Sequence, residues 1–301
     1  GFDQWRLFGW HEGPRYYQPY IWENGRRRPE LADRYGPDLY VDFLIDFIQT
    51  DERRPFFAFY SMALCPDVTD DLEDPVPTGP EGRYQSYAEM VDAMDERVGR
   101  LLDGLADAGV EQNTLVIYLG DNGTPQRVIT HVEDGQLVRR PVVSVRDGRM
   151  INDGKAELTD AGTRVPWLVR WPAAIEQPAV VDQLVDATDL LPTLLELAGG
   201  ELPANATLDG QSFAATLWGR PTQQQRSWVF AEHKGAAFVR GPRWKLYHDG
   251  RFFDLQADPG ERRSLPTDAL SAEARVAYEA LSPAMYQFKS LGLDREVGEG
   301  R

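Results

Sequence analysis

The stretch Leu115–Thr124, LVIYLGDNGT, decides the fold of this chain, because an apolar run ends there in a polar tail bounded by glycines. The run is short, β-branched and aromatic without a helical period, so it predicts a buried strand. Ligands of open α/β sheets bind at the carboxyl ends of the strands. Asp121 and Asn122 would place two hard oxygen donors there, which suit Ca²⁺ or Mg²⁺. An ordinary turn without a ligand is the alternative, since Asp-Asn-Gly is a common turn sequence.

The elements on either side of this stretch predict an α/β fold. Residues Ser86–Ala108 carry an apolar stripe at helical spacing, and Ser86 and Glu89 have the spacing of a capping box. Phe56–Tyr60, before this helix, is an apolar run that predicts another buried strand. Strand, helix and strand in this order are typical of a βαβ unit. Val165–Trp171 predicts a further buried strand.

Two more helices and an insertion complete the first part of the chain. Apolar residues at helical spacing predict a helix that begins at Asp38 and a second one over Asp186–Ala198. Between Thr124 and Asn152 the sequence is charged and mixed, with a short strand expected at Val142–Val145. We interpret this segment as an insertion over the site.

The composition shifts near Pro221–Gln225, which predicts two domains, residues 1–222 and 223–301. The second domain should hold short strands, at Ala237–Arg240, Trp244–His248 and Arg251–Leu255, and a closing helix over Leu270–Tyr286. Asp249-Gly250 between the last two strands indicates a two-residue type I′ hairpin.

The composition limits the partners of the protein. The 301 residues carry a net charge of −16 and the sequence pI is about 4.7. Such an acidic surface would repel nucleic acid and anionic lipid, and no apolar run is long enough to span a membrane. One cysteine, Cys65, excludes an internal disulfide. An anionic substrate would need local positive charge, which a divalent metal together with a lysine could supply.

Lys155 is the candidate for that lysine. It follows Gly154 in a glycine-bounded loop upstream of Val165–Trp171. Its residue type and position alone favour a solvated surface lysine.

Five segments together resemble the type I sulfatases, members of the alkaline phosphatase superfamily. They are, in the order of that family, Phe56–Leu64, Leu119–Gly123, Gly154-Lys155 with Gly162–Pro166, Asp189–Leu194, and Trp244–Tyr247 with Phe253–Leu255, Asp258-Pro259 and Glu261. The resemblance implies a mixed central sheet flanked by helices, followed by a small antiparallel sheet with a helix. It implies a divalent metal, usually Ca²⁺, bound by Asp121 and Asn122, and a contact between Lys155 and a sulfate oxygen. It also implies a periplasmic or secreted protein.

The chain departs from the family at the nucleophile. The family uses a formylglycine made from Cys or Ser in a Cys-x-Pro-Ser-Arg motif, and this sequence has neither that motif nor the early Asp-Asp metal pair. Cys65 is followed by Pro66-Asp67-Val68, and Pro66 stands where the family usually has a His. We therefore expect a chain truncated at its N-terminal side, without a nucleophile and inactive alone.

Three functions are consistent with this pattern. The first is a sulfuric ester hydrolase that cleaves a small aryl or carbohydrate sulfate with a divalent metal. The second is a phosphodiesterase or phosphonate monoester hydrolase of the same superfamily, because a fold does not fix a function. The third is a non-catalytic relative that binds sulfated glycans, which the missing nucleophile and Pro66 would favour.

Overall fold

The computed structural model describes residues 1–9, 16, 18–50, 54–64, 86–134, 136–146, 148–152, 154–175, 178–202, 205–220 and 225–288. The chain forms two compact units that alternate along the sequence. The first unit comprises Gly1–Leu115 and Pro125–Asp153, and the second comprises Val116–Thr124 and Gly154–Arg301. The domain boundary expected between residues 222 and 223 falls within the second unit and stays a prediction.

The first unit opens with a small antiparallel sheet of β1 (Arg6–Phe8), β2 (Ile21–Glu23) and β3 (Arg26–Arg27). Asn24 and Gly25 join β2 to β3, and both have positive φ, 49° and 83°. Two such residues make a type I′ turn, which matches the twist of the two strands. A short 3₁₀ helix, η1 (Pro29–Leu31), follows.

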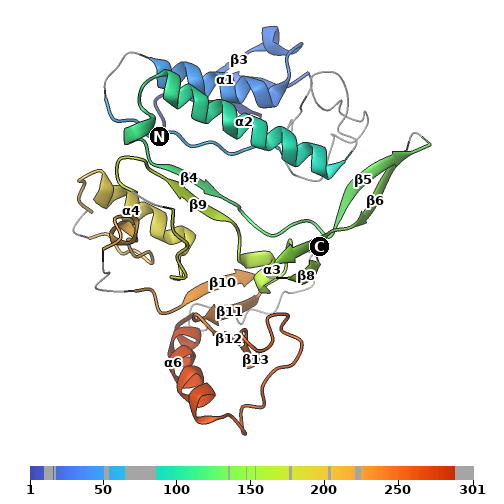
Figure 1. Cartoon of the computed structure of the whole chain (residues 1–301), viewed down its shortest axis with the longest axis vertical. Coiled ribbons are helices and arrows are strands. Elements are labelled where there is room, and N and C mark those ends of the chain that lie inside the picture. The colour runs from blue at the N-terminus through green and yellow to red at the C-terminus, as the bar shows by residue number, and fades with distance from the viewer. Residues whose placement is uncertain are drawn as a thin grey trace. The chain divides into compact units, whose positions relative to one another are not determined.

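Two long helices, α1 (Gly36–Gln49) and α2 (Tyr87–Asp107), pack side by side in the first unit (Figure 1). Ser86 caps α2 by accepting the amide of Glu89 at 3.3 Å, so the N-terminus predicted for this helix is confirmed. Gly104 lets α1 come close, because a Cβ there would lie 2.9 Å from Cγ1 of Ile45. The guanidinium of Arg100 joins the helices by donating to Asp38 at 2.9 Å and to Asp42 at 2.6 Å.

The prediction of a strand at Phe56–Tyr60 is wrong for the described structure. The predicted βαβ unit, which requires that strand, is wrong as well. These residues lie outside any sheet, with Phe57 59% and Phe59 68% exposed. A strand needs a hydrogen-bonded neighbour, and none of the described strands pairs with this segment. The apolar pattern identified a segment suited to a sheet, but could not supply the partner.

The segment between the two parts of the second unit forms two hairpins. β5 (Arg127–Glu133) pairs with β6 (Gln136–Pro141), and β7 (Val143–Arg146) pairs with β8 (Arg149–Asn152). The short strand expected at Val142–Val145 is confirmed as β7. Placement of this insertion over the site stays a prediction.

The second unit contains the deciding stretch as β4 (Val116–Leu119), which pairs antiparallel with β9 (Trp167–Arg170) (Figure 1). Both predicted strands form, but they are not buried as expected. All of β4 is half-buried, and Leu168 of β9 is 62% exposed. In the described part of the chain each strand has only the other as a ladder partner, so each has one edge without a ladder hydrogen bond.

Helix α4 (Leu190–Leu197) continues from the 3₁₀ turn η3 (Ala187–Asp189), as predicted for Asp186–Ala198. At the junction of the two elements, Asp189 is 2% exposed and pairs with Arg226, which is 8% exposed. The carboxylate also accepts the amides of Asp186 at 2.8 Å and Gln211 at 2.6 Å. Gln211 lies just before the short helix α5 (Ala214–Leu217), and Arg226 lies just before the C-terminal sheet. The contacts of Asp189 therefore fix the start of α4 to both segments.

Replacing Arg226 with methionine should destabilise the protein by about 3–5 kcal/mol, because the carboxylate of Asp189 would stay buried without its partner. Urea unfolding measures the change. The double variant R226M/D189N removes the uncompensated charge and should regain a large part of the loss. As a control, R251M breaks the exposed pair with Asp249 and should change little. Equal losses for R226M and R251M would contradict this account.

The C-terminal part forms a four-stranded antiparallel sheet covered by a helix (Figure 1). Its strands are β10 (Val229–His233), β11 (Ala236–Arg240), β12 (Trp244–Tyr247) and β13 (Phe252–Asp254). Helix α6 (Ala272–Phe288) contacts β11 and β12, and its Leu281 and Met285 enter one buried cluster with Val239. The strands and the closing helix predicted for this region are confirmed.

The turn between β12 and β13 differs from the predicted type I′ hairpin. Gly250 has φ +90°, but Asp249 does not have the positive φ that a type I′ turn also requires. The amide of Tyr247 donates to the carbonyl of Arg251 at 2.8 Å and closes a three-residue loop. The amide of His248 donates to Ala237 of the neighbouring strand at 2.9 Å, which ties the first loop residue to β11.

Candidate active site

The candidate site begins where β4 ends. The amide of Gly120 donates to the carbonyl of Pro166 at 3.0 Å, which is the last contact of the ladder toward β9. Asp121 and Asn122 follow and are exposed. The amide of Asn122 donates to Oδ1 of Asp121 at 2.8 Å, and Nδ2 of Asn122 donates to the carbonyl of Gly123 at 3.2 Å. The two polar side chains therefore sit on a tight loop directly at the carboxyl end of a strand, as predicted.

Backbone hydrogen bonds join this loop to the segment that carries Lys155. The carbonyl of Thr124 accepts the amides of Gly154 at 3.0 Å and Lys155 at 2.9 Å. The amide of Gly123 donates to the carbonyl of Gly162 at 3.0 Å. The tertiary structure thus brings the two predicted motifs together, although the whole insertion separates them in sequence.

Three glycines make this junction possible. A Cβ on Gly123 or on Gly154 would overlap the carbonyl oxygen of Ala161, and a Cβ on Gly162 would overlap the carbonyl of Glu157. Each obstacle is backbone, which cannot rotate away as a flexible side chain could. The three positions accept only glycine because the two segments pack main chain against main chain.

Lys155 lies at the start of a loop that is held by hydrogen bonds between residues close in sequence. The amide of Glu157 donates to the carbonyl of Gly154 at 2.9 Å, and the short helix α3 (Asp160–Thr163) closes the loop. The side chain of Lys155 is exposed, and no carboxylate of the described residues pairs with it. Its charge is therefore available to an anion, while its backbone is fixed next to the Asp121-Asn122 loop.

The donor set fits a hard cation only in part. Carboxylate and amide oxygens of Asp121 and Asn122 are the ligand types that Ca²⁺ and Mg²⁺ prefer. Within the described ranges, however, no group of three or more His, Cys, Asp or Glu side chains could hold a metal ion. A complete coordination shell therefore needs oxygen donors beyond these two. Cys65, Pro66 and Asp67 lie outside the described residues.

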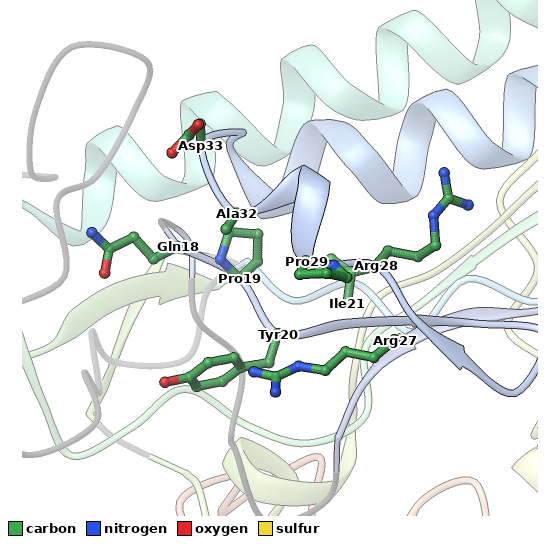
Figure 2. Close-up of a pocket in the computed structure, with 9 residues that line it drawn as sticks. All are labelled: Gln18, Pro19, Tyr20, Ile21, Arg27, Arg28, Pro29, Ala32 and Asp33. Atoms are coloured by element: carbon green, nitrogen blue, oxygen red, sulfur yellow. The ribbon is translucent and has the colours of Figure 1, made fainter.

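A separate pocket of about 260 Å³ lies in the first unit and contains none of the predicted site residues (Figure 2). Tyr20 and Arg27 are among its lining residues, and the guanidinium carbon of Arg27 lies 5.2 Å from the centre of the Tyr20 ring. Arg28, also in the lining, is paired with Glu23 and Glu30. The lining gives no constellation for ester hydrolysis.

A buried polar cluster near the Lys155 loop was not predicted. It consists of Asp160, Arg240, Lys245, Tyr247 and Glu261. Two sequence signals pointed to this region: a lysine between apolar residues in a predicted strand, Trp244-Lys245-Leu246, and the sulfatase-like segments that contain Lys245, Tyr247 and Glu261. A charge in such a place predicts either an exposed strand face or a buried partner, and only the structure decides between them.

The fold and this loop arrangement define an α/β protein with a polar site at a strand end and a C-terminal antiparallel sheet covered by a helix. A family model described as Sulfatase matches residues 1–200, and one described as N-sulphoglucosamine sulphohydrolase, C-terminal, matches residues 153–280. The chain belongs to the sulfatase family, whose alkaline phosphatase-like α/β fold was predicted from the sequence.

Individual relatives agree with this assignment. The chain is 29% identical to mouse (Mus musculus) steryl-sulfatase over 286 residues, which covers 79% of this chain and 44% of that protein. It is 29% identical to bovine (Bos taurus) arylsulfatase A over 287 residues, covering 83% of this chain and 52% of the relative. A solved structure of a protein in complex with its substrate D-glucosamine-2-N,6-O-disulfate shares the fold, with a TM-score of 0.66 and 19% identity. That match covers 98% of this chain and 78% of the other.

The chain spans about half the length of these curated relatives. Membership of the family implies a divalent metal ion. No helix in the described part of the chain is long and apolar enough to cross a membrane.

Proposed function

We propose that the whole protein to which this chain belongs is a sulfuric ester hydrolase. It would convert a sulfate ester and water into an alcohol and inorganic sulfate. One observation carries the proposal beyond family membership: the backbone of Thr124 holds Lys155 beside the Asp121-Asn122 loop. A hydrolase of anionic esters needs oxygen donors that bind a cation and a separate positive group that contacts the anionic part of the ester. This junction supplies residues of both kinds.

Asp121 and Asn122 would provide oxygen ligands to the metal, with Ca²⁺ as the proposed ion and Mg²⁺ as the alternative. When bound, a divalent cation polarises the ester and lowers the cost of negative charge at the reacting group. Lys155 would donate from its ammonium group to a sulfate oxygen. Its exposed side chain on an anchored backbone suits that role, since an anion must reach the charge from solvent.

The substrate class proposed is an aryl or carbohydrate sulfate. Sequence relatives carry the names steryl-sulfatase and arylsulfatase, and a structural neighbour was solved with a disulfated glucosamine. The strongly acidic net charge of −16 favours a small anion over an extended polyanion, which the protein surface would repel.

The test is sulfate release by the protein expressed from its whole coding sequence, with formylglycine verified by mass spectrometry. We expect turnover of 4-nitrophenyl sulfate or of a sulfated glucosamine, and loss of turnover after metal chelation with recovery on adding Ca²⁺. Asp121→Ala should lower kcat/KM by at least about a hundredfold, because the metal loses a charged ligand. Asp268→Ala, which removes an exposed carboxylate of the same unit, should not.

Two outcomes would replace the proposal. A higher kcat/KM for a matched aryl phosphonate ester than for the aryl sulfate would identify a phosphonate monoester hydrolase. Binding of sulfated glycans without turnover, in protein with formylglycine present, would identify a non-catalytic relative.

A further inference from the structure

A buried polar cluster joins the loop of residues 154–163, which carries Lys155, to the C-terminal sheet. These contacts are separate from those of the glycine junction. Nζ of Lys245, on β12, donates to the carbonyl of Leu158 at 2.5 Å and to Oε1 of Glu261 at 2.8 Å. The hydroxyl of Tyr247 donates to Oε2 of Glu261 and lies 3.2 Å from the same carbonyl oxygen. The Leu158 carbonyl therefore accepts a hydrogen bond from Lys245 and lies next to a second side chain of the same strand.

The helix that closes the loop is held by the same cluster. The guanidinium of Arg240, on β11, donates to both carboxylate oxygens of Asp160 at 3.2 Å each. The amide of Asp160 donates to Oε1 of Glu261 at 3.3 Å. Asp160 opens α3, so these bonds fix the segment whose Gly162 contacts Gly123.

Burial makes these contacts selective for one arrangement. Lys245 has no exposed surface, and its ammonium lies 4.0 Å from the centre of the Phe238 ring and 5.1 Å from that of Tyr247. Burial lowers the pKa of Lys245, while Glu261 opposes that effect. Burial and the bond to Glu261 raise the pKa of Tyr247. A buried charge has no solvent to replace a lost partner, so displacing the loop would leave Lys245 and Glu261 undersatisfied.

Replacing the cluster with apolar residues would give the same sheet a core of similar volume, and such exchanges are often neutral or stabilising. Stability alone therefore gives little reason for a fully buried lysine here. What the cluster adds is a fixed position for the loop, because its hydrogen bonds end on two loop residues, Leu158 and Asp160.

We propose that Lys245 and Glu261 are positioning residues for the candidate active site. Through Leu158 and Asp160 they hold the loop of residues 154–163, and the loop in turn holds Lys155 beside Asp121 and Asn122. The proposal rests on the proposed function for its kinetic consequence, but the ordering of the loop is independent of any activity.

Hydrogen exchange followed by mass spectrometry tests the ordering directly in the whole protein. In K245M, peptides that cover residues 154–164 should exchange about tenfold faster or more, while peptides of α6 keep their rates. K245M/E261Q removes both charges and guards against a folding failure caused by an unpaired carboxylate. R243M is the matched control, because Arg243 bonds Asp254 of the same sheet and Glu273 of α6, and no hydrogen bond or ion pair described for its side chain reaches the loop.

Kinetics test whether the effect passes through Lys155. K245M/E261Q should lower kcat/KM by about tenfold to a hundredfold, as expected when a reacting group is misplaced. In a K155A background most of this loss should disappear, whereas general destabilisation would add to the loss caused by K155A.

A folded K245M/E261Q variant with unchanged exchange in residues 154–164 would overturn the proposal, as would losses that add fully to those of K155A. If the wild-type protein releases no sulfate, the proposed function fails, but faster exchange in K245M and unchanged exchange in R243M would still support the positioning role.

Discussion

Replacing Gly162 with alanine should destabilise the second unit by about 3 kcal/mol or more, because the added methyl group meets backbone that cannot move aside. Its Cβ would overlap the carbonyls of both Glu157 and Gly154. The loop of residues 154–163 would have to separate from the Gly123 turn, and sulfate release should fall by about a hundredfold as Lys155 leaves its place. Thermal unfolding and kcat/KM measure the two effects.

Gly99→Ala is the matched control, because the same methyl group is added at a position that is free to accept it. Gly99 lies within α2, and a Cβ there has no neighbouring atom within 4 Å. Alanine should therefore stabilise the helix by about 0.5–1 kcal/mol. Opposite signs for the two substitutions separate steric packing from the general effect of removing a glycine. A Gly162→Ala protein as stable and active as wild type would refute the glycine junction.

Replacing Lys155 with alanine should lower kcat/KM for a sulfate ester by about 10²–10³-fold with the unfolding temperature nearly unchanged. The side chain is exposed and takes part in no described ion pair, so removing it should leave packing intact. Any loss of activity then reports lost stabilisation of charge on the sulfate group. Lys155→Arg keeps the charge but changes its shape, and should retain an intermediate rate.

Arg262→Ala controls for the change in net charge. Arg262 is an exposed cation of the same unit, and removing it makes a protein of net charge −16 equally more acidic. A weaker general attraction for anions would affect both variants alike. Comparable activity of K155A and R262A would show that Lys155 is an ordinary surface lysine, which is the alternative that its sequence position allowed.

The substitutions of Gly162 and Lys155 test different properties of the same site. Gly162 determines whether the loop can approach the Asp121-Asn122 turn, and Lys155 determines what charge the loop brings there. The buried pair of Lys245 and Glu261 is proposed to hold the loop in place through contacts with the C-terminal sheet.

Local patterns were enough to predict most elements of the second unit. The apolar run at Val116–Leu119, the spacing in Asp186–Ala198 and the strands before α6 all formed, because period and turn residues act over a few neighbours. The order of short motifs also sufficed to predict membership of the sulfatase family. The roles of Asp121, Asn122 and Lys155 remain predictions that rest on that resemblance.

Only the tertiary structure decided which segments meet. Phe56–Tyr60 has the composition of a strand but no ladder partner in the described structure, since pairing depends on a neighbour that the local sequence does not encode. The Asp249-Gly250 turn became a three-residue loop once His248 was bonded to β11. The local sequence around Lys245 does not distinguish it from an exposed strand lysine. The structure shows that its ammonium group donates to the Leu158 carbonyl and to Glu261. Sequence alone determined most elements of the second unit and the family, whereas the meeting of Thr124 with Lys155 and the burial of Lys245 arise from contacts between distant residues, which no local pattern can specify.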